Sequence, residues 1–144
     1  MIRSLNNLGG AWKSLGQYKK AIEFYEEALR IDKMRFGDEH PKVAIRLNNL
    51  GSAWYSLGQY KKAIEFFEEA LRIDKMRFGD EHPDVAIDLN NLGLAWDSLG
   101  QYKKAIEFYE EALSIFNQTF PNGHPNIDIV KNSLNQAKQL LLTN

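Results

Sequence analysis

Apolar residues recur along this chain at helical spacing, in two alternating kinds of segment. In the first kind, residues 41–57, the side chains Leu47, Leu50 and Trp54 are three and four positions apart and share one helix face. The second kind, residues 60–73, carries an apolar stripe of Ala63, Ile64, Phe67, Ala70, Leu71 and Ile73. Polar residues fill the remaining positions of both segments. The pattern therefore predicts amphipathic helices packed in pairs, and an all-α fold.

Proline and glycine mark where these helices are expected to begin and end. The first helix of each pair follows a His-Pro dipeptide, whose histidines are His40, His82 and His124. Proline suits a first helical turn because it has no backbone N–H to leave unpaired. The helix is expected to stop at a glycine in the left-handed conformation, namely Gly16, Gly58 and Gly100. The chain then re-enters helix at Tyr-Lys-Lys, which predicts a series of helical hairpins.

The segment Leu-Asn-Asn-Leu-Gly occurs three times, at residues 5–9, 47–51 and 89–93, with a spacing of 42 residues. Repeats of this kind bury their apolar faces by stacking on neighbours and present an open surface rather than a closed catalytic pocket. In a degenerate fourth copy, Asn135 and Lys138 replace Gly93 and Trp96, which predicts a capping helix. We expect repeats at residues 1–40, with a slightly truncated first helix, at 41–82 and at 83–124, and a cap at 125–144.

A set of small and aromatic residues in each repeat resembles the tetratricopeptide repeat; in the second copy it is Leu50, Gly51, Trp54, Gly58, Tyr60, Ala63, Phe67 and Ala70. The copies are eight residues longer than the usual 34, and Lys33 and Lys75 replace the usual closing proline. The longer second helix and the Gly-Asp-x-His-Pro turn are similar to the 42-residue units of kinesin light chains. The resemblance implies a right-handed α-solenoid whose first helices line a concave groove.

The near-identical copies differ mainly on one face of the first helix. Between residues 2–40 and 44–82, six of 39 aligned positions differ, and five of these lie on that helix. On a helical wheel, Ile45, Asn48 and Tyr55 fall on a second stripe, away from the buried one. The resemblance implies that this stripe faces a ligand. The predicted groove residues are Asn6, Asn48, Asn90, Asn49, Asn91, Lys13, Tyr55, Asp97, Ser52, Leu94, Arg46 and Asp88.

The invariant asparagines suggest how a groove could bind peptide, because an amide offers both a donor and an acceptor to an extended backbone. The variable positions Lys13, Tyr55, Asp97, Arg46 and Asp88 would then set specificity. Two alternatives stay open. The flanking Asn7, Asn49 and Asn91 could instead bond neighbouring helices, and the variation could be drift at exposed positions after duplication.

Composition narrows the class of protein. The chain has 144 residues, 44% hydrophobic and 26% charged, with no cysteine and a net charge of −1. No apolar run approaches the ~20 residues of a membrane span, and the first residues lack a signal-peptide pattern, so a cytoplasmic protein without membrane contact is expected. The near-neutral charge argues against a nucleic-acid partner.

Catalytic chemistry is not indicated. The histidines recur one per repeat, so stacking should hold them too far apart to share a metal. The Glu-Glu pairs lie on the outer helix face, and no phosphate-binding loop is present. The tryptophans Trp12, Trp54 and Trp96 repeat with the core spacing and are interpreted as packing. We therefore predict no enzyme activity, cofactor or metal.

Two functions remain. The first is a protein-interaction module that binds a peptide segment of a partner protein in the groove. The alternative is a self-assembling scaffold, an excised or engineered piece of a longer array. This alternative rests on Met1, which aligns with Val43 and Val85, so that the first helix begins late and lacks a cap. The uncovered edge of that helix could bind another copy of the chain and form a homo-oligomer.

Overall fold

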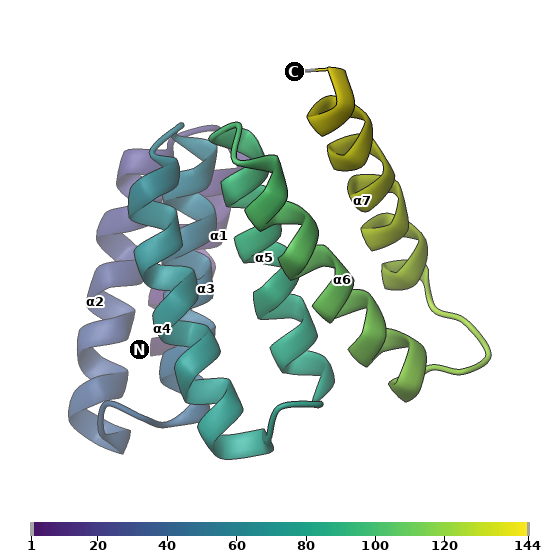
Figure 1. The fold of residues 1–144 in the computed structure, drawn as a ribbon. Helices are drawn as coiled ribbons and strands as arrows, with labels where there is room; N and C mark the ends of the chain where they lie inside the picture. The colour runs from purple at the N-terminus through teal and green to yellow at the C-terminus, as the bar shows by residue number, and fades with distance from the viewer. Residues whose placement is uncertain (1, 144) are drawn as a thin grey trace. The chain divides into compact units, whose positions relative to one another are not determined.

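The computed structural model describes residues 2–143, with side chains from Leu5 onward. Within that range the chain forms seven α-helices and no strand (Figure 1), which confirms the all-α prediction. The helices are α1 (Ile2–Ser14), α2 (Tyr18–Phe36), α3 (Pro41–Ser56), α4 (Tyr60–Phe78), α5 (Pro83–Ser98), α6 (Tyr102–Thr119) and α7 (Pro125–Thr143). Met1, on which the predicted uncapped edge depends, lies outside the described residues, as does the side chain of Arg3.

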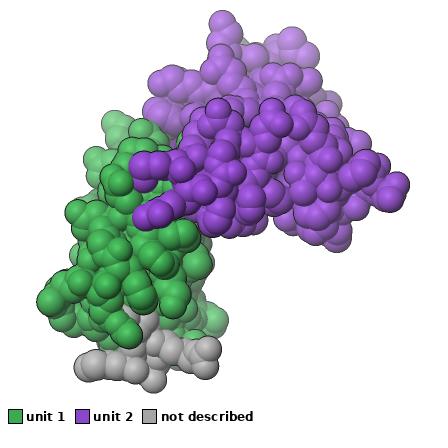
Figure 2. Space-filling model, turned by 90° about the horizontal axis from the view of Figure 1, so that it is seen from below, with its two compact units in different colours: residues 1–73 green, residues 74–144 purple. Residues whose placement is uncertain are grey.

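The chain divides into two compact units (Figure 2), Met1–Ile73 and Asp74–Asn144, and the boundary falls within α4. In unit 1, α1 packs against α2 and α2 against α3. In unit 2, α5 packs against α6, and α7 contacts both. None of the described helices is long and apolar enough to cross a membrane.

The helix boundaries follow the predicted proline and glycine positions. Helices α3, α5 and α7 begin at their prolines, and the glycines that end the first helices, Gly16, Gly58 and Gly100, have φ values of 78°, 86° and 80°. The histidine before each proline has a role that the sequence did not suggest. In α5, His82 Nδ1 accepts a hydrogen bond from the Asp84 backbone N–H at 3.1 Å, and its ring stacks on Phe78 with centroids 4.4 Å apart. His40 and His124 make the same bond and stack. Each histidine therefore caps the helix that follows.

In unit 1 a small residue brings the two helices of a hairpin together. Gly51 of α3 lies against the ring of Phe67, which is buried in α4. Trp12 and Trp54 are partly buried against the core formed by Ala21, Ile22, Tyr25, Leu50 and Ala53, in line with the packing interpretation. Their exposed ring faces are covered by lysines, with Lys62 Nζ 4.6 Å from the Trp54 ring centroid.

Unit 2 repeats this packing and extends it to α7. Gly93 of α5 lies against the ring of Tyr109, which is fully buried in α6. Helix α7 buries one apolar stripe, consisting of Ile127, Val130, Leu134 and Ala137. Its Asn135 and Lys138 side chains are exposed. The apolar positions of the degenerate fourth copy therefore still pack, although its glycine and tryptophan are lost.

Candidate functional site

The asparagines of the first helices in unit 1 differ in their hydrogen bonds and burial. Asn49 Nδ2 on α3 donates a hydrogen bond to Asn6 Oδ1 on α1 at 2.9 Å. A flanking asparagine therefore satisfies the acceptor of a stripe asparagine on the neighbouring first helix. Asn49 thus has the interhelical role that was the alternative to ligand contact. Asn48, one residue earlier, is half-buried on the same helix.

Lys13 is the cation of the predicted stripe in unit 1. Its Nζ donates a hydrogen bond to Ser52 Oγ, which joins α1 to α3. Burial lowers the pKa of the Lys13 ammonium below its ordinary value. Among the described residues, no ion pair joins Lys13 to a carboxylate. Near the end of α3, Tyr55 is partly buried and packs its ring 5.0 Å from that of Tyr60.

Arg46 makes a polar contact between helices of unit 1. Its Nε lies 2.7 Å from Oδ2 of Asp32 on α2, and the Asp32 side chain is only 1% exposed. The sequence placed Arg46 in the groove because it differs between copies. In the structure it bonds to the preceding second helix, where it neutralises a buried carboxylate.

The same two positions carry a pair of acids in unit 2. Asp74 and Asp88, 42 residues after Asp32 and Arg46, are both buried and hydrogen-bonded to each other. Burial raises the pKa of Asp74 and nearby Asp84 adds to this, whereas the bond with Asp88 and the proximity of His82 lower it. Two carboxyl groups can form such a bond only if they share a proton. Asp88, also placed in the groove by the sequence, is thus engaged between α4 and α5.

On α5 the predicted stripe continues with Ile87, Asn90, Leu94 and Asp97. Asp97 Oδ2 accepts a hydrogen bond from the Tyr109 hydroxyl at 3.0 Å, and Leu94 is partly buried. The Oδ1 atom of Asn90 is buried, and no donor in the part of the chain that the structure describes reaches it. Asn90 therefore differs from Asn6, whose acceptor is satisfied.

A pocket of about 250 Å³ opens beside Asn90, within unit 2. It is lined by Ile87 and Asn90 of α5, Phe116 of α6, and Asn126, Ile129 and Val130 of α7. Sequence reasoning missed Ile129, which the 42-residue period could have found. It follows Ile45 and Ile87 at that spacing, and these isoleucines are 53%, 42% and 55% exposed in chain order.

The family model described as Tetratricopeptide repeat matches the sequence at residues 1–76 and 55–118. The chain belongs to the tetratricopeptide repeat family. Among curated proteins, no sequence matches it.

Solved structures with the tetratricopeptide fold are similar over nearly the whole chain. A candidate kinesin light chain from Podosopora anserina, with nearly identical TPR-like repeats, has 27% identity and a TM-score of 0.87, covering 96% of this chain and 66% of that one. BtubC (BKLC) from P. vanneervenii has 27% identity and a TM-score of 0.85, covering 97% and 56%. The Sgt2 TPR domain from Aspergillus fumigatus has 27% identity and a TM-score of 0.71, covering 97% and 78%. The chain spans less than two-thirds of the first two structures. The predicted all-α solenoid of kinesin-light-chain-like tetratricopeptide repeats is confirmed.

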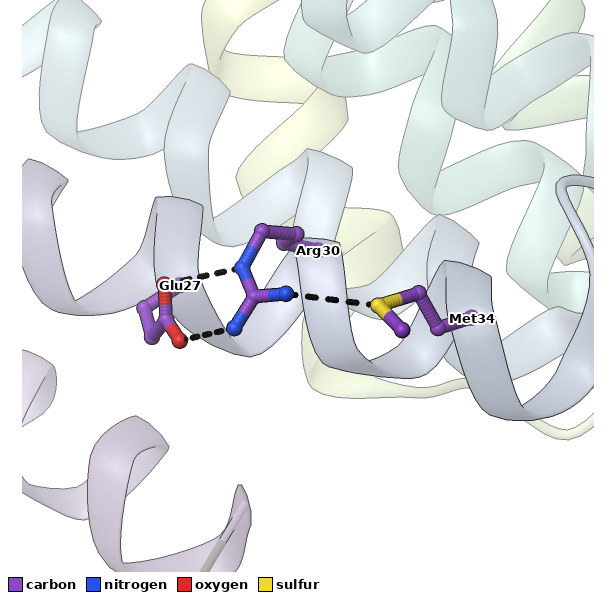
Figure 3. A network of polar contacts seen from close by, with 3 residues as sticks. All are labelled: Glu27, Arg30 and Met34. Carbon is purple, nitrogen blue, oxygen red and sulfur yellow. Dashed lines mark hydrogen bonds and ion pairs between the residues drawn. The ribbon is translucent and has the colours of Figure 1, made fainter.

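The second helices of these tetratricopeptide repeats carry charges that bond within their own helix. On α2, Arg30 Nε donates to Glu27 Oε2 at 3.1 Å, and its Nη1 lies 3.3 Å from Met34 Sδ (Figure 3). The hydrogen bond from Arg30 lowers the pKa of the exposed Glu27 carboxyl. Such contacts are typical of a solvated helix face. In residues 2–143, no three histidine, aspartate or glutamate side chains are grouped so that they could hold a metal ion.

Proposed function

We propose that this chain is a non-enzymatic interaction module that binds a peptide segment of a partner protein on the asparagine-bearing face of its first helices. Membership of the tetratricopeptide repeat family supports this, because the family consists generally of interaction modules rather than enzymes. We call this face of each first helix the amide stripe; its members are Asn6, Lys13, Ile45, Asn48, Ser52 and Tyr55 in unit 1, and Ile87, Asn90, Leu94 and Asp97 in unit 2.

The observation that carries the proposal is the exposure of isoleucine beside asparagine at the same register of successive first helices. Ile45 and Ile87 remain exposed although their helices bury other apolar residues, and each precedes an asparagine by three positions. Residues three apart lie on the same helix face. Apolar contact next to amide donors and acceptors suits an extended peptide, whose side chains and backbone need both.

Lys13 is proposed to add specificity. Within the residues whose side chains the structure describes, the Lys13 ammonium bonds a hydroxyl and no carboxylate. Because it is half-buried, it gains more from a ligand carboxylate than a solvated lysine does, since less water competes. A peptide with an acidic residue near α1 is therefore favoured. Arg46 and Asp88 are each bonded between helices, so the proposal assigns ligand contact to the other members of the predicted groove.

A display screen of random and proteomic peptides tests the proposal. The chain is compared with an Asn48→Ala, Asn90→Ala double variant and with a control, Lys61→Ala, Lys103→Ala, whose changes are exposed on the second helices. Circular dichroism establishes that all three proteins are equally helical.

The proposal predicts peptides that are enriched on the parent chain and on the lysine control but lost on the asparagine double variant. Equal enrichment on all three proteins would overturn it, as would an absence of enrichment. A mass in light scattering that grows with concentration, together with no enrichment, would favour the self-assembling scaffold.

A further inference from the structure

Helix α1 exposes an apolar face that a later first helix buries. In α3, Leu50 and Ala53 are 0% exposed and pack in one cluster with side chains of the preceding α2. Leu8 and Ala11 occupy the same register of α1, where Leu8 is 46% exposed and Ala11 is exposed too. Leu15, one turn further on, is 72% exposed. This face is therefore complementary to a helix like α2 rather than to a charged ligand.

Helix α6 carries the same surface that α2 offers to α3. The α2 members of the cluster are Ala21, Ile22 and Tyr25. Their counterparts on α6, two repeat periods later, are Ala105, Ile106 and Tyr109, which are the same residue types. Because α1 repeats the apolar pair of α3 and α6 repeats the surface of α2, α1 of one molecule is complementary to α6 of another.

In the structure, α7 of the same chain packs on α6. Its Leu134 and Ala137, three repeat periods after the apolar pair of α1, are 7% and 0% exposed. The cover is less complete than in unit 1, because Ile106 is only partly buried whereas Ile22 is 4% exposed. Helix α7 thus occupies the surface of α6 that matches α1, without closing it fully.

Helix α7 has polar residues where the other first helices pack on a hairpin partner. Gly93 of α5 lies against Tyr109, but its counterpart on α7 is the exposed Asn135. The exposed Lys138 likewise stands where Trp96 is found on α5. In Figure 1, α7 is the outer helix beside α6. A helix that buries a single apolar stripe detaches at a lower free energy than one that is packed on two sides.

We propose that α6 has two alternative occupants, α7 of its own chain and, when α7 detaches, α1 of a second copy. In the second arrangement the apolar pair of α1 packs on Ala105 and Ile106 as the pair of α3 packs on α2. The contact is heterologous, so each added molecule again presents a free α1 or a free α6 and the assembly grows head to tail. Helix α7 is favoured as the occupant because it is tethered to α6, and it therefore acts as a lid that keeps the chain monomeric. This assembly is independent of peptide binding, because neither face belongs to the amide stripe.

Three chains divide the proposed contact between two molecules. The acceptor carries Leu134→Asp, which places a charge beneath α7 and detaches it, and Ala11→Glu, which blocks its own α1. The donor is the parent chain, with both faces intact. The matched control donor carries only Ala11→Glu, a change at an exposed position. Circular dichroism establishes that each chain is helical, and sedimentation velocity measures its mass alone and in mixtures.

Each chain alone is expected to be monomeric at micromolar concentration, and the acceptor and donor should form a one-to-one complex when they are mixed. The control donor should bind the acceptor about tenfold more weakly or worse, because its carboxylate enters an apolar contact. Leu134→Asp alone, which leaves α1 free, should form chains whose mass rises with concentration. If the acceptor loses helicity, Leu134→Ala replaces Leu134→Asp, since it removes packing without adding a charge. A mixture with a helical acceptor that stays monomeric, or equal binding of donor and control donor, would overturn the proposal.

Engineered cysteines test the register, because the chain itself has none. Ile106→Cys in the acceptor and Ala11→Cys in the donor should form an intermolecular disulfide under mild oxidation, as expected for two positions in contact. Glu111→Cys in the acceptor is the control, because it lies on another side of α6 and should not crosslink. Disulfides between two Ala11→Cys donors would contradict the proposal, because they would show that α1 pairs with itself. Equal crosslinking by the Glu111→Cys control would also contradict it.

Discussion

Replacing Gly51 with alanine tests the helix packing of the repeats. A Cβ atom at Gly51 would lie 2.4 Å from Phe67 Cε1 and 2.6 Å from Cδ1. Carbon atoms pack at ~3.5–4.0 Å, so the ring or the helix must move by roughly 1 Å or more. Phe67 is only 3% exposed, and its displacement would disturb its neighbours.

The magnitude follows from two opposing effects. Overpacking of a core costs about 1–3 kcal/mol, whereas alanine in a helix gains about 1 kcal/mol over glycine. Gly51→Ala should therefore lower the free energy of unfolding by up to about 2 kcal/mol. Gly10 is the matched control, because its Cβ would meet only Tyr25 Oη, at 3.8 Å. Gly10→Ala should raise the free energy of unfolding by about 0.5–1 kcal/mol.

Urea unfolding followed by far-UV circular dichroism measures both effects. The expected result is a lower midpoint for Gly51→Ala and a higher one for Gly10→Ala, with similar m-values. Equal stabilisation by the two substitutions would refute the reasoning, because it would show that Phe67 does not restrict position 51.

Three further predictions concern the polar contacts between and at the ends of the helices. Arg46→Ala should lower the free energy of unfolding, measured by urea titration, by about 3–5 kcal/mol, because Asp32 stays buried without its cation. A loss below about 1 kcal/mol would contradict this. The pKa of Asp74 is raised in the folded state, so the folded chain binds that proton more tightly than the unfolded chain does. The stability that this proton contributes should therefore be greatest at acid pH and decline as the pH rises through the raised pKa. Asp74→Asn should flatten this dependence in thermal unfolding across acid to neutral pH, and an unchanged profile would count against it. His82→Ala should lower the melting temperature by the equivalent of about 1 kcal/mol while His82→Asn retains the cap, and equal losses for the two would exclude a capping role.

The helices and their order could be predicted from the sequence because their signals are local. A proline at the start, a glycine with positive φ at the end and an apolar stripe between them each act within one or two turns. The small and aromatic residues that recur in each repeat then carried the resemblance to the tetratricopeptide family. The cap by His82 was missed because proline alone explained the helix start, although the Phe78-to-His82 spacing recurs in all three turns.

The polar contacts between helices could not be predicted in the same way. Arg46 and Asp88 vary between copies, and variation was interpreted as exposure toward a ligand. Their partners, Asp32 and Asp74, stand near the end of the preceding second helix, where the first two copies are identical. Only the packing of that helix against the next first helix brings the charges together.

The unsatisfied acceptor of Asn90 becomes meaningful only in the folded chain. Asn49 satisfies Asn6, 43 positions earlier, across two first helices. Ser133 stands 43 positions after Asn90, and no donor among the described residues reaches Asn90 Oδ1. The sequence contains both facts. Only the structure shows that an asparagine pairs with a residue 43 positions later, which is one position more than the repeat period.

Photo-crosslinking of a display-selected peptide to the intact chain tests the central claim most directly, because it locates the ligand. The peptide carries a photoreactive residue, and the crosslinked positions are identified by mass spectrometry. The account predicts crosslinks on the amide stripe of α3 and α5, around Asn48 and Asn90, that disappear when excess unlabelled peptide is added. Crosslinks that excess unlabelled peptide abolishes but that lie only on the second helices α2 and α6 would contradict it.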